Sequence, residues 1–326
     1  MFVQIFRYTR DHQKEWDRFV RESNNGNLFH YRKFLTYHIG RTFNDHSLII
    51  KKKNRIIALF PAAERTIDGE KVLHSHPGAS YGGFVTGVLG YGDADRILEI
   101  FESYCRTRQF RRIFFVPTPV LYFKHYDETL EYALLWRQFA TIETYISSFI
   151  ELSGTAEDLL NRINKRKRRY IRNLPENPDL RLEWNKNYDE YYPILVRNKA
   201  KHGVQPTHSL EELKKLDQLF PGQLNLLMCY YQNKPIGGTL NFTANDRVVI
   251  IFYNMVDDSH PELQPASLQI WETMRWAHSA GFRFLDFGVS QLPLAENPLT
   301  PSKSLILFKE HFGSRNMIRK AMEKRL

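Results

Sequence analysis

The sequence is poor in cysteine, and this narrows the classes of protein that it can encode. Among 326 residues only Cys105 and Cys229 are cysteines, and they lie far apart without a Cys-x-x-Cys spacing. Such a pair supports neither a disulfide framework nor a zinc cluster. His74 and His76 fall on one face of a predicted strand, but no third ligand accompanies them, so we predict no metal site.

Long apolar segments are also missing. The longest apolar run, Val248–Phe252, is far too short to cross a bilayer, and residues 1–16 lack the apolar stretch of a signal peptide. We therefore expect a cytoplasmic protein without a transmembrane segment. The glycine-rich segment Pro77–Phe84 lacks the spacing of nucleotide-binding loops, and no Cys or Ser stands in a nucleophile motif.

The segment Arg162–Arg172 contains no acidic residue and seven basic ones. The whole chain has a net charge of +10. On a helix, like charges three or four residues apart repel one another by about a few tenths of a kcal/mol per pair. A sequence that keeps several such pairs indicates an anionic partner. A solvated basic turn is the alternative.

Predicted helices and strands alternate along most of the chain, which indicates an α/β fold. The order of elements restarts after about residue 150, so we predict two domains, residues 1–150 and 151–326. Both halves contain helices, then antiparallel strands, then a helix followed by a strand. That last pair comprises residues 93–108 and 112–116 in the first half, and 268–280 and 282–287 in the second.

The second half begins with the basic segment. Residues Ser153–Thr155 are placed to cap a helix that runs through the basic segment to about Leu174, where Pro175 and Pro178 end it. Asp93 is placed to cap the helix of residues 93–108 in the same way. Three strands with tight turns follow the basic helix as a meander, at residues 224–231, 236–243 and 247–255.

Several segments, taken in order, resemble the FemAB-like and BioF2-like branch of the GNAT superfamily. They are Trp16–Phe19 with Ser23–His30, the basic segment, Gly237–Leu240, Ala277–Gly281, Phe284–Gly288 (Phe-Leu-Asp-Phe-Gly) and Leu307–Gly313 (Leu-Phe-Lys-Glu-His-Phe-Gly). The resemblance spans nearly the whole chain. It implies two tandem GNAT-like domains, each a mixed, largely antiparallel sheet flanked by helices, and an acyltransferase activity.

The resemblance also implies binding residues. In Fem-like enzymes an Arg of the basic helix and a Lys of an early helix hold the phosphorylated acceptor. Arg168, Arg169 and Arg172 match the Arg, and Lys33 is the best match for the Lys, with Arg32 as the next. Guanidinium groups suit this task because they bind phosphate oxygens in pairs. Lys309 matches the lysine of the family's ending, which faces the donor or acceptor channel; an ordinary surface lysine is the alternative.

Three further residues are candidates for the chemistry. Asp286 ends a predicted strand and is a candidate general base, although capping the following turn is the alternative. Tyr253 and Asn254 end the strand that begins at Val248, where a GNAT-like sheet splays and receives substrate. Both side chains are candidates to orient the acceptor, and a place in the core is the alternative for the tyrosine.

Together these features predict an N-acyltransferase or aminoacyltransferase with no tightly bound cofactor. Acyl-CoA or aminoacyl-tRNA is the predicted co-substrate, and the acceptor is an amine on a phosphate-bearing or lipid-linked molecule of the cell envelope. The pyrophosphate loop of ordinary GNAT proteins is not recognisable, since Leu263–Ser267 stands in its place. The alternatives are a non-catalytic RNA-binding protein, and a peripheral protein whose basic segment lies on the inner membrane face.

Overall fold

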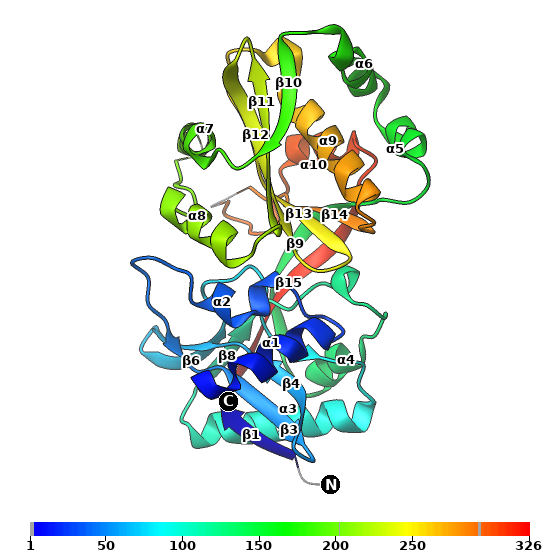
Figure 1. Cartoon of the computed structure of the whole chain (residues 1–326). Coiled ribbons are helices and arrows are strands. Elements are labelled where there is room, and N and C mark those ends of the chain that lie inside the picture. Colours follow the sequence, from blue (N-terminus) through cyan, green and yellow to red (C-terminus); the bar gives the residue numbers. More distant parts are fainter. Residues whose placement is uncertain (1–2, 202, 293–294) are drawn as a thin grey trace. The chain divides into compact units, whose positions relative to one another are not determined.

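The computed structural model describes residues 3–201, 203–292 and 295–326, which form two compact units (Figure 1). Unit 1 comprises Met1–Tyr145 and Ile318–Leu326, and unit 2 comprises Ile146–Met317. The chain therefore passes between the units inside two strands, β9 (Ala140–Glu151) and β15 (Arg315–Arg325). The division predicted after residue 150 falls before the last residue of β9, and the two units divide earlier in the same strand.

Unit 1 contains two sheets and their covering helices. One sheet has the order β1-β3-β4-β7, and the other contains β15-β8-β6-β5-β2. A core of aliphatic and aromatic side chains, among them Phe60, Phe101 and Phe115, fills the unit. The elements are β1 (Val3–Arg7), α1 (Gln13–Glu22), α2 (Arg32–Leu35), β2 (Asn44–Asp45), β3 (Leu48–Lys52), β4 (Arg55–Phe60), β5 (Ala63–Ile67), β6 (Glu70–Ser75), β7 (Val85–Thr86), α3 (Tyr91–Thr107), β8 (Arg112–Phe115) and α4 (Thr129–Trp136).

Unit 2 is built on strands in the order β10-β11-β12-β13-β14-β9, all antiparallel except the pair β13 and β14. Each unit thus has the mixed, largely antiparallel sheet flanked by helices that the sequence predicts. The elements are α5 (Ala156–Arg162), α6 (Lys165–Asn173), β10 (Leu180–Asn185), α7 (Tyr188–Ala200), α8 (Leu210–Leu219), β11 (Leu224–Tyr231), β12 (Lys234–Thr243), β13 (Val248–Val256), α9 (Pro265–Ser279), β14 (Phe284–Val289) and α10 (Lys303–Glu310).

Helices α7 and α9 cover opposite faces of the unit 2 sheet, and two adjacent glycines allow both to approach. A Cβ on Gly238 would come 2.7 Å from the ring of Tyr191 on α7, and one on Gly237 would come 2.2 Å from Nε2 of Gln269 on α9. Only glycine admits backbone contacts this close. Below α9 the core is aliphatic and aromatic, with Leu285 and Phe287 of β14 among its members.

Strands β13 and β14 separate along their length. They pair in parallel only from Val248 to Ile250 on β13, whereas β13 continues along β12 as far as Val256. A bulge at Phe252 shifts the register with β12, because Leu240 pairs with Tyr253 while Asn241 pairs with Ile251. Bulges often occur where a strand is redirected next to a binding site.

The basic segment forms two helices, which corrects the single helix expected from the sequence. Thr155 caps α5 as predicted, since its side chain accepts the Asp158 N–H. Helix α5 ends at Arg162, and Ile163 is extended. A new helix, α6, then begins behind Asn164, whose side chain accepts the Arg166 N–H. An internal Asn cap competes with helix continuation, so the segment breaks there.

Within the described ranges, none of the helices is both long enough and apolar enough to cross a bilayer.

Candidate functional site

The end of strand β14 is held by Lys309 from helix α10. Its ammonium group donates to Gly288 O at 2.8 Å, Val289 O at 3.1 Å and Ser290 Oγ at 2.7 Å. An ammonium group has three hydrogens, so all are used. The side chain is 4% exposed, and burial lowers its pKa to about 8. Lys309 is therefore a buried cation fixed at a strand end, not the surface lysine of the alternative interpretation.

Asp286 belongs to the same strand end. Its Oδ1 accepts the Gly288 N–H at 2.7 Å and lies 3.4 Å from Ser147 Oγ, and the residue is 1% exposed. The carboxylate also acts electrostatically on Lys309, whose charged form it stabilises. The structure thus brings Asp286 and Lys309 together, with the carboxylate in the turn-capping position that the sequence offered as the alternative to a general base.

Tyr253 and Asn254 are neighbours in the chain but lie on opposite faces of the sheet. Tyr253 is buried on the α7 side, where its hydroxyl accepts the Thr207 N–H at 3.2 Å and lies 3.0 Å from His208 Nδ1. Burial raises the pKa of the Tyr253 phenol, so it stays neutral near pH 7. Asn254 pairs with Thr239 and faces α9.

The free edge of β13 offers backbone donors. Asp257 N–H donates to Ile236 O at 2.7 Å, which fixes the alternation of hydrogen bonds between β12 and β13. By that alternation the N–H groups of Asn254 and Val256 point away from β12, toward the side that β14 has left. Such donors can stabilise the oxyanion of a tetrahedral intermediate.

The arginines of α6 differ in their surroundings. Arg168 donates to Asn161 Oδ1 at 2.8 Å, and Arg172 pairs with Glu157 at 2.9 Å, so both are tied to α5. Arg169 is exposed, and its guanidinium stands 5.6 Å from the ring of the adjacent Tyr170.

One cation of the basic segment turns inward, and sequence reasoning did not single it out. Lys167 donates to Ser267 Oγ at 3.0 Å in the first turn of α9, and its ammonium lies 4.5 Å from the ring centroid of Phe308. Burial lowers its pKa. The direction of the Lys167 side chain depends on the residue at which α6 begins. The sequence does not show this residue, so it does not distinguish Lys167 from the other six basic residues of the segment.

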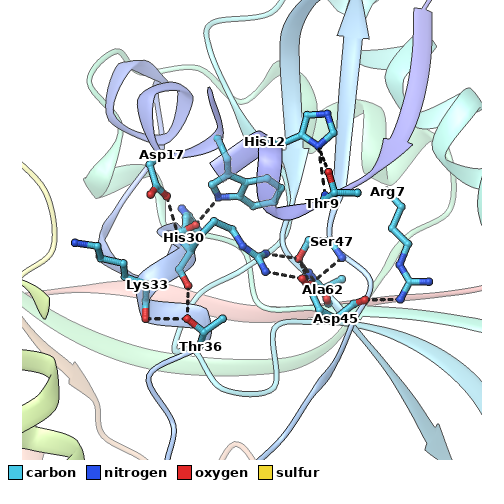
Figure 2. A network of polar contacts seen from close by, with 12 residues as sticks. Arg7, Thr9, His12, Asp17, His30, Lys33, Thr36, Asp45, Ser47 and Ala62 are labelled. Atoms are coloured by element: carbon cyan, nitrogen blue, oxygen red, sulfur yellow. Dashed lines mark hydrogen bonds and ion pairs between the residues drawn. The ribbon is translucent and has the colours of Figure 1, made fainter. Parts of the chain in front are cut away.

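Lys33 belongs to unit 1 and the other seven predicted site residues belong to unit 2. The Lys33 side chain is exposed and points away from the polar network beside it (Figure 2). Arg32 is buried within that network, where it donates to Ser47 Oγ at 2.8 Å and to Asp45 Oδ2 at 2.5 Å. Arg32, the neighbouring cation, therefore has a structural role, which leaves Lys33 as the cation of α2 that faces solvent.

Residues 161–294 match the family model of the acetyltransferase (GNAT) domain. The splayed strands β13 and β14 lie within this match. The chain contains a GNAT acyltransferase domain. A comparison with curated protein sequences finds no match.

Solved structures extend this GNAT assignment to the fold of the whole chain. FemX is 12% identical with a TM-score of 0.72, and the alignment covers 99% of this chain and 97% of that chain. The C-terminal domain of a putative lysylphosphatidylglycerol synthetase from Agrobacterium fabrum is 10% identical, with coverages of 96% and 91% and a TM-score of 0.60. A tandem GNAT protein from the clavulanic acid biosynthesis pathway is 8% identical, with coverages of 99% and 98% and a TM-score of 0.55. These likenesses show the fold and confirm the resemblance stated from the sequence.

Proposed function

We propose that this acyltransferase moves an acyl or aminoacyl group from an activated ester or thioester to an amine on a phosphate-bearing acceptor. The observation that carries the proposal is the divergence of β13 from β14 inside the GNAT domain. The reacting carbonyl enters this gap, where the N–H groups of Asn254 and Val256 receive the developing oxyanion. The acceptor amine attacks the carbonyl carbon directly and forms the C–N bond. The C–O or C–S bond to the carrier then breaks, and the proton that the amine loses leaves on the oxygen or sulfur of the carrier.

Lys309 supports this chemistry as a fixed positive charge. Because its three hydrogens are held by β14 and Ser290, it acts on the transition state through its field and through the shape of the strand end. Such preorganised charge is effective in a buried site because little reorganisation is needed during the reaction. Asp286 keeps Lys309 protonated and caps the turn, so we assign it a positioning role.

We assign the phosphate of the acceptor to Arg169 of α6, and Lys33 of α2 is a separate candidate for phosphate binding on unit 1. Arg169 is exposed, whereas Arg168 and Arg172 each have a partner on α5. GNAT acyltransferases use acyl-CoA, and the FemAB-like resemblance adds aminoacyl-tRNA as a candidate donor. Because the chain is an acyltransferase, we set aside the non-catalytic RNA-binding alternative.

A donor and acceptor screen tests this function. Radiolabelled acetyl-CoA and a pool of radiolabelled aminoacyl-tRNA are each offered with glucosamine and with glucosamine 6-phosphate as matched acceptors. We expect transfer from one donor class, with a clear preference for the phosphorylated amine. Arg169→Ala should raise the KM for that acceptor, and Lys33→Ala tests the separate candidate by the same measurement. Strong RNA binding without transfer from any donor would contradict the proposal, and an unchanged KM in Arg169→Ala would remove the phosphate assignment.

A further inference from the structure

Helix α9 and strand β12 enclose a row of buried polar side chains. Thr239, Asn241, Gln269 and Thr273 are each 0% exposed. One end of the row is satisfied by internal hydrogen bonds. Asn241 Nδ2 donates to Asn225 O at 3.2 Å and lies 3.5 Å from Thr273 Oγ1, while Thr239 donates to Asn241 Oδ1 at 3.3 Å.

The other end of the row is not satisfied by protein groups. Neither Oε1 nor Nε2 of Gln269 has a hydrogen-bond partner among the residues that the structure describes, although both atoms are buried. The buried Oδ1 of Asn254 likewise has no hydrogen-bond partner among the described residues. A fully buried carboxamide without partners carries its whole desolvation cost, and folded proteins rarely keep such groups without a function.

These two carboxamides lie on one face of the sheet, beside the gap between β13 and β14. Asn254 is opposite Thr239 in the register, and Gly237 is opposite Val256 at the end of β13. The Gln269 amide occupies the space that a side chain at position 237 would take, since a Cβ there would lie 2.2 Å from Nε2. Gly237 thus admits this amide to the sheet surface at the level where β14 has left β13.

We propose that Gln269 and Asn254 bind an amide group of a substrate that enters this gap. A trans secondary amide presents its N–H and its C=O on opposite edges, so it needs one acceptor and one donor from two separate groups, which Asn254 Oδ1 and Gln269 Nε2 supply. Two substrates of the proposed function contain amides: the pantetheine arm of an acyl-CoA and a peptide-bearing acceptor. The inference rests on the proposed function for the identity of these substrates.

The variant Gln269→Met tests the proposal because it keeps the length of the side chain and removes both polar atoms. In the free protein this change removes two unpartnered groups, so the Tm should stay equal or rise. The KM of the amide-bearing substrate should rise about tenfold, which corresponds to about 1.4 kcal/mol of lost binding, and kcat should change less. Thr273→Val, one turn along the same helix face, is the matched control: it removes a partnered hydroxyl and should lower the Tm without changing KM.

Two small amides distinguish the pantetheine arm of an acyl-CoA from a peptide-bearing acceptor as the bound substrate. Pantetheine and N-acetylalanine methylamide are titrated by calorimetry into the wild-type protein and into Gln269→Met. Binding of one of them that is lost in the variant supports the proposal and names the source. If neither amide binds, or if Gln269→Met lowers the Tm and leaves KM unchanged, the carboxamides hold ordered water only and the proposal is overturned. An intact amide site in a protein that transfers no acyl group would instead remove the proposed function.

Discussion

At the scale of single residues, Lys309 links stability to chemistry. Lys309→Met leaves Gly288 O, Val289 O and Ser290 Oγ without their buried donor, which should lower the free energy of unfolding by about 3 kcal/mol. Transfer should slow about 100-fold, the usual effect of removing one preorganised charge or donor. Urea unfolding and kcat at saturating substrate measure the two effects. A variant that loses stability but keeps kcat would show that Lys309 is structural only.

The pH dependence of the transfer rate and that of the stability separate the catalytic role of Lys309 from its structural role. Burial lowers its pKa in the folded protein to about 8, so transfer that requires its charge should fall as the pH rises through 8. Stability moves in the opposite direction: the unfolded chain, with the ordinary pKa of 10.5, binds more protons across this window, so unfolding becomes harder as the pH rises. Lys309→Arg keeps its charge to higher pH and should lose the alkaline limb of the activity profile. A limb near pH 8 that persists in this variant would contradict the assignment.

At the scale of elements, the sequence predicts which segments form helices and strands better than which way their side chains face. The meander of β11, β12 and β13 follows from turns and apolar strands. Tyr253 and Asn254 face opposite sides because neighbouring residues of a strand alternate. Which of the two faces α9 depends on the bulge at Phe252, and such a bulge arises from pairing between strands and cannot be recognised from composition. The start of helix α3 is a second example of this difference. The sequence predicts Asp93 as the cap, but α3 starts earlier, at Tyr91, and the Asp93 carboxylate pairs with Lys52 at 2.5 Å.

The break between α5 and α6 leads to a prediction about the arginines. Arg172 already pairs with Glu157, whereas Arg169 has no carboxylate partner among the described residues. Arg169→Ala should therefore weaken binding of glucosamine 6-phosphate about tenfold, or about 1.4 kcal/mol, and reduce its salt dependence. Arg172→Ala, the matched control, should change affinity less because the carboxylate of Glu157 lies beside its guanidinium and repels a phosphate. Calorimetry at low and high salt measures both, and equal effects of the two variants would contradict this distinction.

At the scale of the whole molecule, the two units differ from the division read in the sequence because strands β9 and β15 each belong to both. A boundary inside a strand has no loop, proline or change in composition to reveal it. The last residues, Ile318–Leu326, complete the sheet of unit 1 by pairing β15 with β8. The stability of unit 1 therefore depends on both ends of the chain, and changes in β15 act on a unit that lies far away in sequence.

Unit 1 should be sensitive to acid because burial keeps several of its histidines neutral. Burial lowers the pKa of His30 and His76 to about 3 and that of His74 to about 4. Below the ordinary value of 6.5 the unfolded chain takes up protons that the folded unit does not, so stability is fully present above pH 6.5 and falls as the pH decreases toward 4. Each of these histidines lowers the free energy of unfolding by about 1.4 kcal/mol for each pH unit below 6.5 until its folded-state pKa is reached. Urea unfolding at pH 7.5, 6 and 5, with hydrogen exchange of unit 1 peptides, should show this slope, and His74→Phe should reduce it by one proton. Stability that stays constant between pH 7.5 and 5 would contradict the prediction.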